Sequence, residues 1–238
     1  MRPEFPLGPI QGDELLVSLQ LAPPACSGLD GWQPVELVVL NLVAAQFLAD
    51  LLNAVEAGAP WPTSMLQGRT ATLPKEDSPT HPLDYRLLSI LSVLYRRWAA
   101  LRLQHLEPWI ASWVPAESYG GICGRGAEDA WYRAGLEVEL ARVGGVPLSG
   151  LCSDVYKCFD QVDRDMLYHF MSLAGLPTGI LTAYQAFHSN IQYRNTLNGR
   201  LGRPHTRVAS IPQGCPLSMM LIALWAAPWV SLVKKVGG

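Results

Sequence analysis

The pattern of apolar and polar positions predicts a protein rich in helices. Between residues 35 and 57, apolar residues recur every three or four positions, which is the spacing of one helix face. Gly58 and Pro60 then end this helix, because glycine favours the cap position and proline cannot continue the hydrogen-bond ladder. The same pattern predicts helices at residues 35–57, 87–105, 127–143, 163–173 and 177–188, and a last apolar helix after residue 214. Residues 1–34 are rich in proline and glycine and are predicted to be irregular.

Shorter apolar runs between these helices predict strands. Residues 147–155 fit a buried strand, and residues 71–75 fit a short one. Two further runs, 191–197 and 203–209, flank Asn198-Gly199, and Asn-Gly between two such runs is a strong hairpin signal. The order of helices, strand, helices, hairpin and helix predicts the α+β class, with helices packed on an incomplete antiparallel sheet.

Charge is unevenly distributed along the chain, although the net charge is only −2. All 20 acidic residues lie at or before Asp165. The Lys and Arg residues beyond it are Arg194, Arg200, Arg203, Arg207, Lys234 and Lys235. This asymmetry is compatible with one face that binds a polyanion. An arbitrary cut through a longer protein explains it equally well.

The cysteines and the last apolar stretch indicate whether the protein binds zinc, is secreted or spans a membrane. None of the 5 cysteines forms a Cys-x-x-Cys pair, so no zinc site is predicted, and reduced thiols in an intracellular protein are expected. No secretory signal peptide is recognisable. Residues 217–233 lack charge but are slightly short for a membrane span and contain Pro228. A buried core helix is therefore favoured and no membrane partner is expected, with an integral membrane protein as the remote alternative.

Two segments carry residues suited to chemistry. Residues 151–160 place a carboxylate, Asp154, at the end of a predicted strand, and aspartate is a hard oxygen ligand suited to Mg²⁺. Taken alone, an aspartate in this place is more often a cap or turn residue. Residues 211–218 read Ile-Pro-Gln-Gly-Cys-Pro-Leu-Ser, where Gly214 allows close backbone approach and Ser218 can form a local hydrogen bond. This segment alone predicts only a strand–turn–helix junction.

Together and in this order, the two segments resemble motifs A and B of reverse transcriptases. Asp154, Phe159 and Asp160 match motif A, and residues 212–218 match motif B as it is written in retroelements without long terminal repeats (non-LTR). Weaker matches precede them at residues 27–32, 73–75, 85–90 and 119–126. The resemblance covers residue 27 onwards and is to the LINE-like, non-LTR class. It implies an irregular segment at 1–26, a fingers-like helical region at 27–145 and a partial palm at 146–238.

The resemblance also assigns roles around motif A. It makes Asp154 the catalytic residue and places Asp154 and Val155 at two Mg²⁺ ions, which activate the 3′-hydroxyl and hold the triphosphate in such polymerases. The backbone amide of Val155 is expected at the triphosphate, with its side chain in the core. Phe159 occupies the place of the steric gate, which selects deoxynucleotides. Asp160 is expected to be a structural turn or cap residue.

Other positions take nucleotide and nucleic-acid roles in the same way. Lys75 and Arg86 are placed at the incoming triphosphate, and Gln213 and Gly214 at the nucleotide and template pocket. Ordinary loop solvation is the alternative for Lys75 and Arg86. The hairpin arginines either track a phosphate backbone or are simply solvated; they are Arg194, Arg200, Arg203 and Arg207. The partners implied are an RNA template, a DNA primer and deoxynucleoside triphosphates.

This sequence departs from the family pattern in several places. Motif C, which carries the second metal-binding carboxylate of the family, is not found, since no Asp or Glu follows Asp165. Leu87 replaces a proline, and residues 120–122 lack the usual aromatic-arginine pair. The chain is therefore expected not to polymerise DNA as it stands. The alternatives are a non-catalytic nucleic-acid-binding remnant and a pseudogene product without function.

Overall fold

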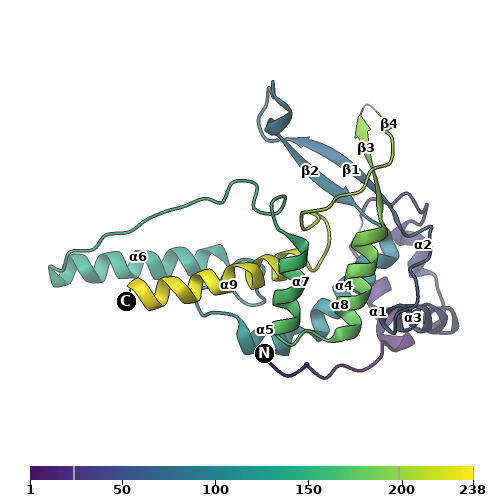
Figure 1. The fold of residues 1–238 in the computed structure, drawn as a ribbon, viewed down its shortest axis with the longest axis horizontal. Helices are drawn as coiled ribbons and strands as arrows, with labels where there is room; N and C mark the ends of the chain where they lie inside the picture. Colours follow the sequence, from purple (N-terminus) through teal and green to yellow (C-terminus); the bar gives the residue numbers. More distant parts are fainter. Residues whose placement is uncertain (24, 198, 238) are drawn as a thin grey trace.

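The computed structural model describes residues 1–23, 25–197 and 199–237. Helices form the body of the molecule, one small sheet projects from one side of it, and α6 and α9 extend away as a long arm (Figure 1). The predicted α+β class is confirmed. The elements are α1 (Gly12–Gln20), α2 (Pro34–Val38), α3 (Leu42–Glu56), β1 (Gln67–Pro74), a 3-10 turn (Pro82–Asp84), β2 (Tyr85–Ile90), α4 (Val93–His105), α5 (Glu107–Trp113), α6 (Ala127–Gly144), α7 (Arg164–Leu173), α8 (Thr178–Asn190), β3 (Gln192–Leu197), β4 (Arg200–Leu201) and α9 (Ser218–Gly237).

The first fifty residues are more helical than their proline and glycine content predicts. Helix α1 forms within the segment expected to be irregular, and Glu14 accepts a hydrogen bond from the Gln11 amide at its first turn. The single helix predicted at 35–57 is two helices, α2 and α3. The Asn41 side chain accepts from the Ala44 amide at 2.9 Å and starts α3, because asparagine favours the N-cap over the helix interior.

The helix predicted at residues 87–105 begins as strand and becomes helix only at Val93. Residues Tyr85–Ile90 form β2, which pairs antiparallel with β1 from Pro74↔Tyr85 to Arg69↔Ile90. Helix α4 begins only after Ser92, whose Oγ accepts from the Tyr95 amide. The apolar run before Ser92 fits both the helical and the strand period, and its pairing with β1 decides in favour of a strand.

The sheet has the order β2-β1-β3-β4 and is mixed rather than purely antiparallel. Strands β1 and β3 run parallel, from Gln67↔Gln192 to Thr70↔Asn195. A hairpin is present as β3 and β4, but β4 lies before the strand expected at 203–209, and that segment forms only an isolated bridge between His205 and Tyr193. Gly199 has φ +75°, as a tight turn requires, and Asn198 lies outside the described residues.

The strand predicted at residues 147–155 is not formed. The segment runs without regular structure from the far end of α6 back toward α7 (Figure 1), and Leu151 is 94% exposed. A strand requires neighbouring backbone to satisfy its amides and carbonyls, and no strand of the described chain pairs with this segment. Local apolar content alone is therefore not enough to make it a buried strand.

The core lies between α3, α4 and α8 and is rich in aromatic side chains. Tyr95 stacks on Phe187 with ring centroids 3.6 Å apart, and Trp61 packs edge-on against both. The buried Arg102 side chain pairs with Glu56 at 2.6 Å, and Trp98 Nε1 donates to the same carboxylate at 2.7 Å. The carboxylate thus meets a charge and an indole donor together, which offsets the cost of burying it.

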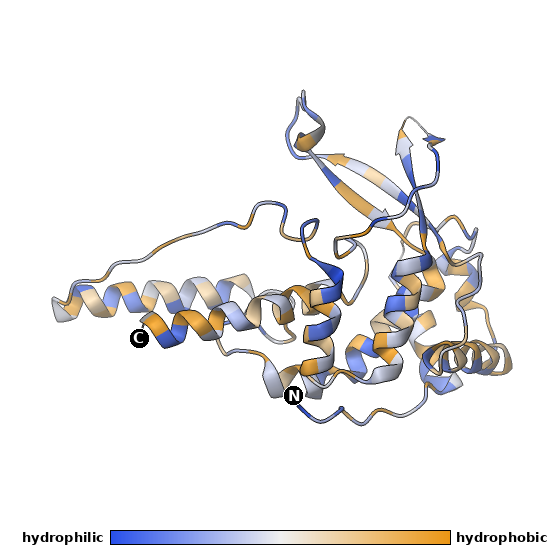
Figure 2. Cartoon of the chain, in the orientation of Figure 1, coloured by the Kyte–Doolittle hydropathy of each residue, from blue (hydrophilic) through white to orange (hydrophobic). Residues whose placement is uncertain are grey.

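Helix α9 joins the core only through its first turns. Leu221 and Leu224 are buried, whereas Trp229 and Val236 are exposed, and the exposed end is apolar in Figure 2. The expectation of a buried core helix therefore describes only the N-terminal part of α9. By length and composition, residues Ser218–Val236 also suit a membrane span, with 22% of the most apolar window buried.

Candidate functional site

Motifs A and B are joined through their backbones. The Ile211 amide, immediately before motif B, donates to the Phe159 carbonyl of motif A at 2.9 Å. The Ser210 amide donates to the Val162 carbonyl, also at 2.9 Å. Phe159 itself is half-buried against the core, and Asp160 lies in a turn closed by its amide on the Lys157 carbonyl. The structure thus brings together two motifs that are far apart in the sequence.

The motif B turn is held against strand β2 at close range. The Ser89 amide donates to the Gln213 carbonyl at 2.7 Å. Gly214 has φ +129°, and a Cβ on it would lie 2.1 Å from the Ser89 carbonyl oxygen, so glycine is required here. The expected local bond of Ser218 is present, since its Oγ donates to the Pro212 carbonyl at 2.7 Å. Motif B is therefore positioned by a strand that also carries Arg86.

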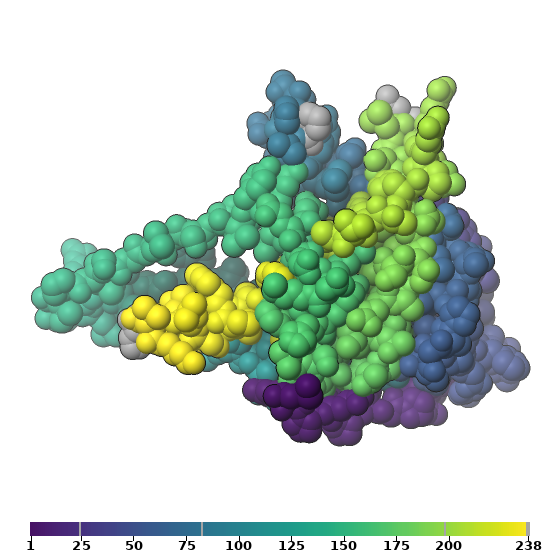
Figure 3. Space-filling model, viewed as in Figure 1, coloured from purple at the N-terminus to yellow at the C-terminus, as the bar shows by residue number. Residues whose placement is uncertain are grey.

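Lys75 and Arg86 lie at the end of the β1–β2 pair where the segment 75–84 connects the two strands. Arg86 faces Leu73 across the pair and is exposed. Lys75 is also exposed, and its Nζ donates to the Leu83 carbonyl at 3.0 Å. Figure 3 shows this end of the sheet and the β3–β4 turn projecting from the same side of the molecule. Neither cation has an acidic partner within the described part of the chain.

Asp154 is exposed at the end of the irregular segment 147–155. Burial of the nearby Cys158 thiol raises its pKa, and the charge of Asp154 raises it further. Val155 is 66% exposed, so its side chain is not in the core as expected. Among the described residues, no three His, Cys, Asp or Glu side chains gather to hold a metal ion.

Three arginines of the β3–β4 region lie at or near the surface. Arg200 and Arg203 are exposed, and Arg194 is half-buried with its Nη1 on the Gly202 carbonyl at 3.2 Å. Arg69 on β1 lies beside Arg194 in the parallel register and extends this cationic row. Arg69 was not among the predicted site residues, because β1 begins earlier than the run at 71–75 indicates.

Comparison with known proteins identifies the family. A sequence profile described as reverse transcriptase (RNA-dependent DNA polymerase) matches residues 73–236, more than half of the chain. The chain belongs to the reverse transcriptase family. Its sequence is also 27% identical, over 238 aligned residues and 95% of the chain, to the "Transposon TX1 uncharacterized 149 kDa protein" of Xenopus laevis. The chain spans 17% of that protein's length.

Arg207 of this reverse transcriptase chain is engaged inside the protein. Its Nη1 donates to Ser89 Oγ at 3.0 Å and its Nη2 to Thr70 Oγ1 at 2.7 Å. The guanidinium also stacks 4.2 Å above the Tyr193 ring. Arg207 therefore links the segment before motif B to β1, β2 and β3, and it differs from the exposed arginines with which the sequence grouped it.

Arg164 supports the same segment from helix α7. The side chain is 8% exposed and donates to three carbonyl oxygens, those of His188, Arg207 and Ser210. Ser210 has φ +88°, an unfavourable conformation for a residue other than glycine. The contacts of Arg164 and the Val162 bond hold this strained residue in place.

A buried neutral cluster lies behind motif B. The Tyr95 hydroxyl lies 2.9 Å from His188 Nε2 and 3.2 Å from Cys215 Sγ. Burial raises the pKa of the Cys215 thiol to about 11. Burial, and then the charges of Arg164 and Arg207, lower the pKa of His188 well below its usual value. Both groups are therefore uncharged near neutral pH and pack within the core behind motif B.

Proposed function

We propose that this chain forms the fingers and part of the palm of an RNA-directed DNA polymerase from a non-LTR retrotransposon. The observation that carries the proposal is the bonding of motif A to motif B at Phe159–Ile211 and of motif B to β2 at Gln213–Ser89. The motif B sequence and the similarity to a transposon protein favour the non-LTR class. The relative is much longer than this chain, so the activity of a whole protein of that kind belongs to the proposal.

The proposed roles follow the motifs residue by residue. Asp154 and Val155 take part in binding divalent metal ions, proposed to be Mg²⁺, and Phe159 acts as the steric gate against a 2′-hydroxyl. Lys75 and Arg86, exposed at the end of β1–β2, contact the triphosphate of the incoming deoxynucleotide. Gln213 and Gly214 line the nucleotide and template pocket. The partners are an RNA template with a DNA primer.

The 238-residue chain alone is proposed to be unable to polymerise DNA. The reason is that Asp154 has no second carboxylate motif after it and no metal-binding cluster in the described structure. Primer extension on an RNA template with Mg²⁺ tests this, with Asp154→Ala as the paired variant. No incorporation by either protein is expected. Template-dependent incorporation that disappears in Asp154→Ala would overturn the inactivity and support the assigned role of Asp154.

Binding of nucleic acid without catalysis is the second candidate function. It is favoured by the cationic row of Arg69 and Arg194 and by the exposed Arg200 and Arg203, none of which has an acidic partner in the described residues. Fluorescence anisotropy with a labelled RNA–DNA hybrid, measured over a range of salt concentrations, tests it. Replacing Arg194, Arg200 and Arg203 by Gln is expected to weaken binding and flatten its salt dependence.

A matched variant controls for loss of charge anywhere on the surface. Arg142 on α6 is exposed and distant in sequence from the hairpin, so Arg142→Gln is expected to leave hybrid binding unchanged. Equal weakening by Arg142→Gln would point to non-specific attraction. A chain that cannot be obtained as a soluble protein would favour the pseudogene product.

A further inference from the structure

The N-terminal helices form an acidic region without a cation. Residues 3–68 contain no Lys, Arg or His. Their acidic residues are Glu4, Asp13, Glu14, Asp30, Glu36, Asp50 and Glu56. Glu56 and Glu14 are paired with Arg102 and His105 of α4. Asp13, Glu36 and Asp50 are exposed and form no ion pair in the described structure, so their field extends into solvent.

Four exposed apolar side chains lie on α2 and the start of α3, within this acidic region, and we call them the apolar ridge. Val35 lies on α2 and Val39 is its C-cap residue, whereas Val43 and Phe47 lie one turn apart on α3. Their exposed fractions are 66%, 80%, 65% and 71%. Figure 2 shows apolar colour on α3. Single exposed apolar residues are ordinary, but several of them on successive elements mark an interaction surface.

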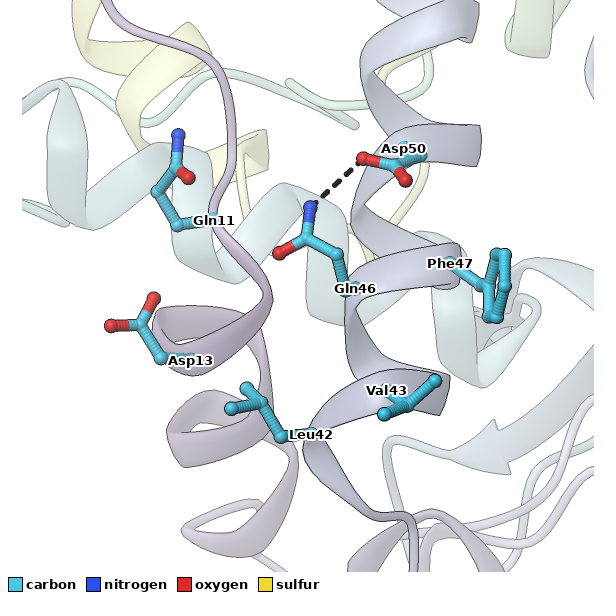
Figure 4. Close-up of a pocket in the computed structure, with 7 residues that line it drawn as sticks. All are labelled: Gln11, Asp13, Leu42, Val43, Gln46, Phe47 and Asp50. Carbon is cyan, nitrogen blue, oxygen red and sulfur yellow. Dashed lines mark hydrogen bonds between the residues drawn. The ribbon is translucent and has the colours of Figure 1, made fainter.

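A groove opens beside the ridge, between the start of α1 and α3 (Figure 4). It has a volume of about 530 Å³, with Leu42 and Val43 on its apolar wall. Gln46 forms a fixed floor, since its Oε1 accepts from the Gly12 amide at 2.9 Å and its Nε2 donates to Asp50 at 2.8 Å. Asp13 and Asp50 lie on either side of Gln46. A partner with apolar residues at its centre and cations at its edges fits this arrangement.

We propose that this groove and ridge bind an amphipathic helix that carries Lys or Arg beside an apolar stripe. Val43 and Phe47 are four residues apart on α3, which is the spacing at which one helix packs into the grooves of another. The unpaired Asp13 and Asp50 select a basic partner. The same charges repel a phosphate backbone, so this face does not bind nucleic acid. The surface is independent of the polymerase function proposed above.

The test uses the whole 238-residue chain and two synthetic peptides. The first is an 18-residue helix with Leu on one face and Lys on the flanks, and the second has every Lys replaced by Glu. Fluorescence anisotropy of the labelled peptides gives the affinity. The Lys peptide is expected to bind, more weakly as salt is raised, and the Glu peptide is not. Phe47→Ala is expected to weaken binding about tenfold, and Asp13→Asn with Asp50→Asn about tenfold together.

Exposed residues of α6 supply the matched controls. Trp131→Ala and Glu139→Gln remove an equally exposed aromatic ring and carboxylate, and both are expected to leave peptide binding unchanged. Thermal unfolding of each variant establishes that the fold is retained. Equal binding of both peptides would overturn the proposal, as would loss of binding in Trp131→Ala but not in Phe47→Ala. Self-association that Phe47→Ala abolishes would make a second copy the occupant and would also overturn it.

Discussion

The Ser89 carbonyl oxygen lies so close to Gly214 that a Cβ on this residue would be only 2.1 Å from it. The amide of the same Ser89 bonds the Gln213 carbonyl at 2.7 Å. Strand β2 thus contacts two successive residues of motif B, which leaves the turn no room to move toward the sheet. Motif B therefore depends on strand β2 for its position, although that strand is far from it in sequence.

Gly214→Ala is predicted to destabilise the protein strongly. The substitution adds a steric overlap with backbone to the strain of φ +129°. Gly58→Ala is the control, because Gly58 has φ +102° with open space around it and reports strain alone. Chemical denaturation should show Gly214→Ala to be less stable than Gly58→Ala by about 2 kcal/mol. Equal losses would mean that β2 yields to the new methyl group.

Ser210→Gly is predicted to stabilise the protein. Ser210 has φ +88°, and its buried Oγ has no hydrogen-bond partner. Glycine relieves the backbone strain, whereas Ser210→Ala removes the hydroxyl and keeps the strain. The free energy of unfolding of the glycine variant should exceed that of the alanine variant by about 1 kcal/mol. A less stable glycine variant would contradict the strained conformation.

Stability is predicted to fall in acid because of His188. Its pKa is lowered in the folded state by burial and by the two nearby arginines, so the unfolded chain binds a proton that the folded chain does not. Below pH about 6.5 the free energy of unfolding should therefore drop by up to about 1.4 kcal/mol per pH unit for this group. His188→Phe should remove that slope, whereas replacing the exposed His169 by Gln should keep it. An unchanged slope in His188→Phe would show that other groups cause it.

Substitution of Arg207 is predicted to affect stability, and substitution of Arg200 is predicted to affect nucleic-acid binding. Arg207→Gln removes the contacts with Ser89, Thr70 and Tyr193 and should lower the free energy of unfolding by about 2 kcal/mol. Arg200→Gln changes an exposed side chain and should leave stability within about 0.5 kcal/mol. On the RNA–DNA hybrid, only Arg200→Gln should reduce the salt dependence. A reduced salt dependence in Arg207→Gln but not in Arg200→Gln would indicate that Arg207 contacts the nucleic acid.

Helix α6 is predicted to exchange its amide protons much faster than α4. None of its residues is buried, and most of the stability of helices in proteins comes from packing one face against other elements. Helix α4 instead buries Tyr95 and Trp98 in the core. Hydrogen–deuterium exchange followed by mass spectrometry on peptic fragments should show this difference within minutes of labelling. Equal protection of the two helices would require contacts that cover α6 in solution.

Local signals predicted those elements whose ends are marked by particular residues. Helix α7 begins after Asp163, whose side chain accepts from the Met166 amide, and α6 ends at Gly145 with φ +63°. The failures have one cause in common. Strand β2 was mistaken for helix because its partner β1 is a separate segment, and residues 147–155 were mistaken for a strand although no described strand pairs with them.

The residues of the candidate site were assigned from the sequence, but their surroundings could not be. Motif spelling assigned roles to Asp154, Phe159, Gln213 and Gly214 without any geometry, and these roles stay predictions. It could not separate Arg207 from Arg200, because burial depends on where β1, β2 and β3 meet. Arg69 was missed for the same reason, since only the parallel register of β1 and β3 places it beside Arg194.

The sequence by itself determined the family, the order of the motifs and the α+β class, because these depend on residue identity and on periodicity within single segments. Tertiary structure alone decided that motif A is bonded to motif B, that Ser89 fits only a glycine at 214, and that Arg207 faces inward. The physical reason is that backbone pairing and burial are set by contacts between segments distant in the chain. No local pattern of apolar and polar residues contains that information.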